Sequence, residues 1–186
     1  MTRSILASAL LLTTIASAAP VPRPSPGFVI HLTPSGQITP EQFKGKVVIL
    51  TFIFTTCPHC QKLTQYLTGL QKEYAVRGLQ ILSAAFNDMP QMYVPDFIKQ
   101  YRPPFPVGYT TRMEVLTFLG HSTMEQLYVP VTVFIDRKGV IRAEYLGDNP
   151  FYQNYELSIR KQVDELLKEP APITKTRPTP TKKKVS

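Results

Sequence analysis

The chain has 186 residues, of which 43% are hydrophobic, so it can bury the core of one domain. Its formal net charge is +8, but much of the excess lies at the two ends of the chain: Arg3, Lys175, Arg177, Lys182, Lys183 and Lys184. The residues between these ends are nearly balanced in charge. The basic composition is therefore no argument for nucleic-acid binding, and we predict no nucleic-acid partner.

The first 18 residues have the pattern of an export signal. Arg3 supplies a positive charge, residues 5–15 are mostly apolar, and residues 16–18 read Ala-Ser-Ala, an A-x-A cleavage pattern. The apolar stretch is shorter than the ~20 residues of a membrane span. We therefore predict cleavage near Ala18 and a periplasmic or otherwise extracytoplasmic protein. An uncleaved signal that anchors the protein to the membrane is the alternative.

Residues 19–27 contain four prolines and predict an extended linker before a single domain over 28–169. Residues 28–32 predict a short strand. Residues 47–54 read Val-Val-Ile-Leu-Thr-Phe-Ile-Phe and predict a strand that helices cover on both faces.

Both cysteines of the chain lie directly after this strand, in Cys57-Pro58-His59-Cys60. A C-x-x-C pair at the start of a helix is typical of a thiol–disulfide redox centre, because the free amides there stabilise a thiolate at the first cysteine. A disulfide that closes so short a loop adds little stability. We therefore predict a redox-active Cys57–Cys60 disulfide rather than a structural one.

The rest of the domain alternates helices and strands. Leu63, Tyr66, Leu67 and Leu70 mark one face of a helix that ends near Gly78. Further strands are predicted at 79–86, 131–135 and 140–145, the last two joined as a hairpin, and helices at 91–101, 115–119 and 155–167. In the last helix, we expect these residues to point inward: Leu157, Val163, Leu166 and Leu167.

This order of elements predicts an α/β fold with a central mixed sheet and helices on both faces. Residues 170–186 are rich in proline and lysine and predict a disordered basic tail. We expect membrane contact only through this tail or an uncleaved signal.

The motif and the element order together resemble the thioredoxin fold, and within it the exported TlpA/ResA-like branch of thiol–disulfide oxidoreductases, over residues 28–167. The landmarks are residues 43–48, the Cys57–Cys60 motif, and residues 129–136 with Gly139 after them. The resemblance implies that Pro130 follows a cis peptide bond beside the cysteines. It also implies that Val129 and Pro130 shape the groove where client proteins dock.

The dipeptide Pro58-His59 is similar to that of the disulfide donor DsbA. A histidine there can donate to the Cys57 sulfur or place positive charge near it, which favours the thiolate and makes the disulfide more oxidising. Pro58 and His59 are therefore predicted to tune the thiolate.

Three positions depart from the related families. Thioredoxins carry a buried acid six residues before the first cysteine, where this chain has Thr51. Many TlpA/ResA-like proteins have a glutamate three residues after the second cysteine, where this chain has Leu63. Thr56 replaces the usual tryptophan before the motif.

The sequence thus predicts an exported enzyme that exchanges disulfides with client proteins through Cys57 and Cys60, together with a separate redox partner and without a further cofactor. The alternative is a copper-delivery protein similar to the Sco family, with Cys57, Cys60 and His121 as ligands. A peroxidase is disfavoured, because Phe54 stands where a peroxiredoxin needs threonine. An adaptor without turnover is a further alternative, which Thr51 and Leu63 favour.

Overall fold

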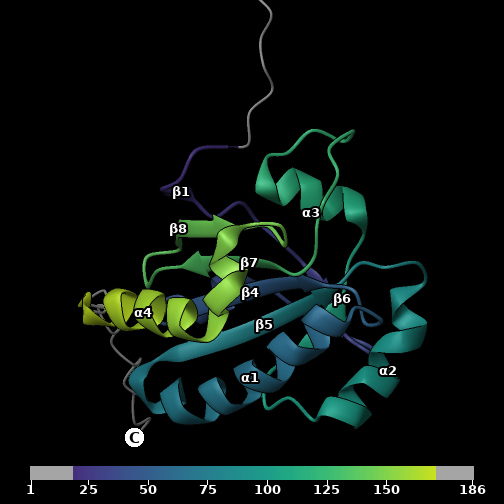
Figure 1. Cartoon of the computed structure of the whole chain (residues 1–186), viewed down its shortest axis with the longest axis horizontal. Helices are drawn as coiled ribbons and strands as arrows, with labels where there is room; N and C mark the ends of the chain where they lie inside the picture. Colours follow the sequence, from purple (N-terminus) through teal and green to yellow (C-terminus); the bar gives the residue numbers. More distant parts are fainter. Residues whose placement is uncertain (1–18, 171–186) are drawn as a thin grey trace, which may run out of the picture.

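The computed structural model describes residues 19–170 (Figure 1). Within this range, eight strands form one sheet in the order β1-β8-β7-β4-β5-β6-β2-β3. The strands are β1 (Arg23–Pro24), β2 (Ile30–His31), β3 (Gln37–Ile38), β4 (Val47–Ile53), β5 (Leu79–Ala85), β6 (Val107–Tyr109), β7 (Val131–Ile135) and β8 (Val140–Tyr145). The predicted signal and nearly all of the predicted tail lie outside the described residues.

Four α-helices and three 3₁₀-helices connect these strands in the described part of the chain. The α-helices are α1 (Pro58–Tyr74), α2 (Pro90–Tyr101), α3 (Arg112–Leu119) and α4 (Tyr155–Lys168). The 3₁₀-helices are η1 (Pro40–Phe43), η2 (Ala75–Arg77) and η3 (Pro150–Asn154). None of the helices between residues 19 and 170 has the length and apolar character of a membrane span.

The sheet is mixed, as the sequence predicts. β4 runs parallel to β5 and antiparallel to β7, and β7 and β8 form the predicted hairpin. β5 also pairs in parallel with β6, to which β2 adds in the antiparallel direction. The parallel pairs lie on one side of β4 and the antiparallel hairpin on the other, so β4 is the central strand.

β4 forms at the centre because every one of its seven residues is apolar or small and all are buried. Side chains alternate between the faces of a strand. Val47, Ile49 and Ile53 therefore enter one core, while Val48, Leu50 and Phe52 enter the other. A strand that is apolar on both faces needs helices on both sides of the sheet.

The two cores receive different helices. The first core, between the sheet and α1, α2 and α4, includes Leu63, Leu67, Val94, Phe97, Ile159 and Val163. The second core, on the opposite face, is closed by α3 with Val115, Leu116, Phe118 and Leu119. Figure 1 shows α1 and α4 lying over the same side of β4 and β5. The predicted α/β architecture is confirmed.

Part of the predicted linker is paired to the sheet. Arg23 and Pro24 form β1, which pairs with β8 at the edge of the sheet. The Arg23 guanidinium lies 2.7 Å from a carboxylate oxygen of Glu144 and donates to the carbonyl oxygens of Ala19 and Leu119. Two residues suffice to attach this segment because the arginine adds side-chain bonds to the short strand pairing.

The inward face of α4 differs from the prediction at one position. Leu157 is 64% exposed, whereas Ile159 is fully buried together with Val163 and Leu166. Residues two apart in an α-helix are separated by about 200° around the axis, so Leu157 and Ile159 cannot share a face. The inward expectation for Leu157 is wrong because the buried face of α4 runs through Ile159, Val163 and Leu166, at the spacing i, i+4 and i+7, and Leu157 lies outside it.

This assignment predicts a difference between two alanine variants. Ile159→Ala should lower the free energy of unfolding by about 2–4 kcal/mol, because it removes buried methyl groups and leaves a cavity. Leu157→Ala should change it by less than about 0.5 kcal/mol. Urea unfolding of both variants measures the difference. Equal losses would place Leu157 in the core and contradict the fold described here.

Candidate active site

The cysteine motif lies where β4 ends and α1 begins. Cys57 is the N-cap residue of α1, and its sulfur accepts a bond from the backbone amide of Cys60 at 3.4 Å. Pro58 takes the first helical position, where its missing N–H costs no hydrogen bond. The first turn of a helix carries about half a positive charge, so this position stabilises a negatively charged sulfur.

The loop before the motif is fixed by side chains from other elements. Asn87, which follows β5, accepts bonds from the amide and the hydroxyl of Thr55 at 3.0 and 3.2 Å. Gln61 donates to the Thr55 carbonyl at 2.9 Å. Phe54 and Phe86 pack edge to face with their ring centroids 4.7 Å apart. These contacts hold Cys57 at the helix start, and sequence reasoning did not identify Asn87 or Gln61.

The two sulfurs have different surroundings. Cys57 is partly exposed, whereas Cys60 is fully buried in the first core. Burial raises the pKa of the Cys60 thiol, and the neighbouring Cys57 acts in the same direction. Cys60 therefore keeps its proton at neutral pH, and Cys57 is the sulfur that reagents can reach.

Pro130 lies beside the motif, as the family resemblance implies. The Val129–Pro130 peptide bond is cis. Val129 packs against both cores, and Cys57 packs against the first of them. The Gly147 amide donates to the carbonyl oxygen of Tyr128 at 2.8 Å and so ties the loop before Pro130 to the segment after β8.

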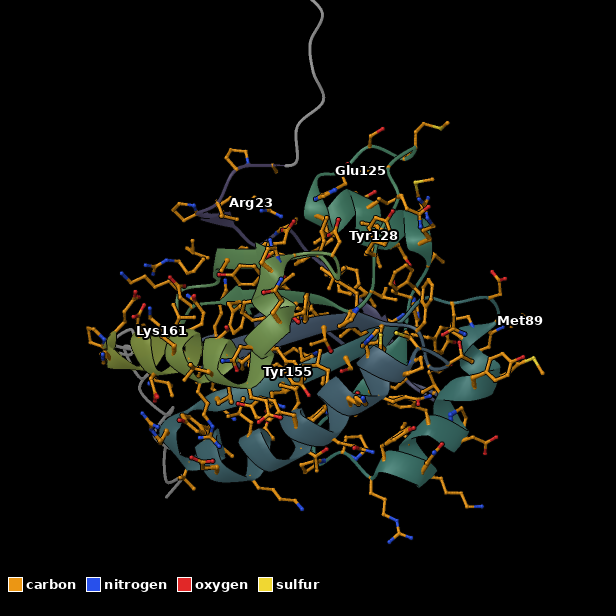
Figure 2. All side chains as sticks on the ribbon, in the orientation of Figure 1. Arg23, Met89, Glu125, Tyr128, Tyr155 and Lys161 are labelled. Atoms are coloured by element: carbon orange, nitrogen blue, oxygen red, sulfur yellow. The ribbon has the colours of Figure 1, made fainter. Side chains whose placement is uncertain are left out.

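A hollow of about 280 Å³ opens between the motif, Pro130 and the segment after β8. Its lining includes His59, Lys62 and Leu63 from α1, together with Pro130, Tyr152 and Tyr155. Figure 2 shows Tyr155 where α4 begins, and its ring packs edge to face against Tyr66 of α1 with centroids 5.6 Å apart. Residues of both helices and Pro130 therefore line the hollow.

His59 is exposed and lines this hollow. Among the hydrogen bonds of residues 19–170, none joins its ring to the Cys57 sulfur, whose partner is the Cys60 amide. The tuning of the Cys57 thiolate by Pro58 and His59 therefore stays a prediction.

The structure does not bring His121 to the cysteines. Its ring nitrogens lie 2.9 Å from Glu125 and 3.2 Å from Glu144, beyond the C-terminus of α3. Within residues 19–170, no group of three or more histidine, cysteine or acidic side chains is arranged to hold a metal ion. The proposed copper ligand set of Cys57, Cys60 and His121 is therefore not assembled, because Glu125 and Glu144 hold the histidine beyond the C-terminus of α3.

The buried Cys60 thiol predicts a pH dependence of stability. In the unfolded chain a thiol loses its proton near pH 8.5, whereas in the folded protein burial raises the pKa of Cys60. Above pH 8.5 the unfolded state therefore binds fewer protons, and the stability of the reduced protein should fall by up to about 1.4 kcal/mol per pH unit. Urea unfolding of reduced wild type and Cys60→Ala between pH 7.5 and 10.5 measures this contribution. Parallel curves for the two proteins would contradict it.

The close approach at Gly147 predicts a second effect. A Cβ atom at this position would lie 2.6 Å from the carbonyl oxygen of Val129, so Gly147→Ala should lower the free energy of unfolding by about 1–3 kcal/mol. Gly69→Ala is the matched control, because Gly69 lies within α1 and a Cβ atom there would meet no atom within 4 Å. It should raise stability by about 0.5–1 kcal/mol. Thermal unfolding of both variants tests the pair, and an unchanged Gly147→Ala would show that the two segments are not in tight contact.

Comparison with known proteins agrees with this geometry. Residues 20–158 match the redoxin family. A protein of Bacillus thuringiensis subsp. konkukian named thiol-disulfide oxidoreductase ResA is 29% identical over 148 residues, which cover 80% of this chain and 77% of the relative. The protein of the same name from Bacillus subtilis is 29% identical over 117 residues, covering 63% of this chain and 62% of the relative.

Solved structures show the same fold. The thiol:disulfide interchange protein of the thioredoxin family from Chlorobium tepidum superposes with a TM-score of 0.66 at 23% identity, covering 81% of this chain and 99% of the other. A thiol:disulfide interchange protein from Bacteroides sp. gives a TM-score of 0.58 at 19% identity, covering 74% and 89%. The resemblance to ResA-like proteins that the sequence predicts is confirmed. Because the family match spans more than half of its length, the chain belongs to the redoxin family.

Proposed function

We propose that this protein is an exported thiol–disulfide oxidoreductase that exchanges disulfides with client proteins through Cys57 and Cys60. The observation that carries the proposal is the contrast between the two sulfurs. Cys57 is partly exposed at the start of α1 and accepts the Cys60 amide, while Cys60 is fully buried three residues later. The relatives named thiol-disulfide oxidoreductase ResA support the same activity.

The reaction follows from this contrast in two steps. The Cys57 thiolate attacks a client disulfide, forms a mixed disulfide with one client sulfur, and releases the other as a thiolate. The Cys60 thiol then loses its proton and attacks the Cys57 sulfur. The Cys57–Cys60 disulfide forms, and the second client sulfur leaves with the proton. Two electrons pass to the client, and the same steps in reverse donate a disulfide. The cysteine pair needs no further cofactor.

Client binding is assigned to the surfaces on both sides of Cys57. On one side lies the hollow that Pro130 lines. On the other lies an open depression, whose lining includes Phe54, Thr56, Phe86, Asp88, Tyr93 and Arg112. An extended client segment that crosses Val129 and Pro130 would contact both surfaces and present its disulfide to the exposed sulfur.

The direction of electron flow depends on how strongly the site favours the thiolate of Cys57. The helix start favours it, and a proton on the nearby His59 would favour it further, which would stabilise the reduced protein and make the disulfide more oxidising. The leader-like residues 1–18 support an extracytoplasmic location, where disulfides persist. We expect a separate redox partner to restore the cysteine pair after each cycle.

The two-step reaction predicts opposite behaviour of two serine variants. Cys60→Ser should form a mixed disulfide with a client and hold it, because the second sulfur is missing. Cys57→Ser should form almost none, because Cys60 is buried. Incubation of each reduced variant with a model protein that contains a disulfide, followed by acid quenching and non-reducing electrophoresis, measures the adducts. Equal trapping by both variants, or by neither, would contradict the assignment of Cys57 as the attacking sulfur.

A further inference from the structure

Four hydroxyl groups lie together on the face of the sheet that holds Cys60. Three of them lie side by side on neighbouring strands. Thr51 of β4 pairs with Ser83 of β5 on one side and with Thr132 of β7 on the other. All three are fully buried. Tyr152 of η3 adds the fourth hydroxyl, which lies 2.9 Å from the Thr132 hydroxyl oxygen.

These side chains point into the first core, as the alternation of the strands requires. Ile49 and Ile53 flank Thr51, Ile81 and Ala85 flank Ser83, and Phe134 follows Thr132 at the same spacing. All of these neighbours belong to the cluster that contains Cys60, and Tyr152 packs against that cluster as well. The hydroxyl row is therefore a polar strip inside the core that buries the second sulfur.

The hydrogen bonds divide the row into two pairs. Thr51 and Ser83 bond to each other at 2.6 Å. The Tyr152 hydroxyl lies 2.9 Å from the Thr132 oxygen and 3.1 Å from the carbonyl oxygen of Tyr145. Tyr152 has a single proton to donate, and both neighbours can accept it, so that proton has more than one acceptor within reach.

Tyr152 is held at this place by its surroundings. The Asn149 side chain caps η3 by accepting the Phe151 amide at 2.9 Å. Phe151 stacks on Tyr145 of β8 with centroids 4.0 Å apart. The Tyr152 hydroxyl therefore points inward to Thr132, while its ring forms part of the wall of the hollow beside the motif.

Tyr152 and Cys60 meet in the same core, because Cys60 belongs to the buried cluster of the first core and Tyr152 packs against that cluster. The pKa of Tyr152 is raised, chiefly by burial, and a negative charge on Cys60 acts in the same direction. Because its pKa is raised, the Tyr152 hydroxyl keeps its proton at neutral pH and can donate a hydrogen bond. Among residues 19–170, Asp136 is the one buried acidic residue, and it is bound to Arg142 at the turn between β7 and β8. The core that buries Cys60 thus contains hydroxyl groups, and one of them, Thr51, stands at the position where thioredoxins carry an acid.

We propose that the Tyr152 hydroxyl, oriented by Thr132, supports the Cys60 thiolate as it forms during the second step of disulfide exchange. The inference rests on the proposed function. It names a side chain that stabilises Cys60, the sulfur that closes the disulfide in the second step. As the Cys60 sulfur attacks the Cys57 sulfur, the Cys60 proton leaves with the departing client thiolate. The Tyr152 O–H then turns toward the negative charge that develops on Cys60. No oxidant or reductant beyond the mixed disulfide is required.

The variants proposed below change Tyr152 or Thr132 and leave the other titratable groups near this strip in place. These other groups are Cys57 and Cys60, Tyr145 of β8 and, around the hollow, His59, Lys62, Asp148 and Tyr155. A change in the pH profile that follows removal of one hydroxyl can therefore be assigned to that hydroxyl.

The test separates the two steps with one reagent, an aromatic disulfide whose released thiolate absorbs light. In stopped flow, the first thiolate reports attack by Cys57, and the second reports closure by Cys60. Tyr152→Phe should slow closure at pH 7 by about tenfold to a hundredfold, the range expected for one hydrogen bond to a charged group, and should move the closure profile to higher pH. The rate of the first step should stay unchanged.

Tyr66→Phe is the matched control, because its hydroxyl donates to the carbonyl oxygen of Glu156 at 2.7 Å on the outer side of α1. It should close at the wild-type rate. Thr132→Val should share the defect of Tyr152→Phe, and Thr132→Ser should restore closure. These Thr132 variants also decide the question if Tyr152→Phe does not fold.

Wild-type closure profiles in folded Tyr152→Phe, or in Thr132→Val, would overturn this inference and leave the proposed function intact. A wild-type protein that releases no first thiolate would remove the proposed function, and this inference with it.

Discussion

The burial of β4 on both faces is the constraint on which the rest of the molecule depends. Because the strand cannot face water on either side, helices must cover both faces, and the chain that leaves it turns through residues 54–57 into α1. That turn leaves Cys57 at the helix start and carries Cys60 into the first core. The difference between two sulfurs only three residues apart is thus a consequence of sheet packing.

The same packing decides what surrounds the second sulfur. An apolar core alone would make a thiolate there very unfavourable. The strands, however, place Thr51, Ser83 and Thr132 in one row, and η3 adds Tyr152. Small hydroxyl groups fit within the sheet without the charge of a carboxylate, so this core remains well packed while it still offers dipoles. The site therefore combines a stable core with a polar strip beneath the cysteine pair.

Much of this could be predicted from the sequence where the signal is local. The apolar run of β4, the spacing of the cysteines and the turn between β7 and β8 specify their elements directly, and these agree with the structure. β6 was not predicted, because three residues after a proline carry no periodic pattern and pair only through the approach of β5 and β2. Tyr152 was not predicted either, since its role depends on contacts between distant segments. A hydroxyl residue within each of three apolar strands, Thr51, Ser83 and Thr132, was the sequence signal of the polar strip.

The pairing of β1 with β8 affects whether two copies of the protein can associate through this edge of the sheet. An outer strand with free amides and carbonyls invites another chain to extend the sheet. Here β8 already pairs with Arg23 and Pro24, and proline cannot donate a backbone bond outward. The short strand β1 thus covers this edge of the sheet and disfavours edge-to-edge aggregation at high concentration.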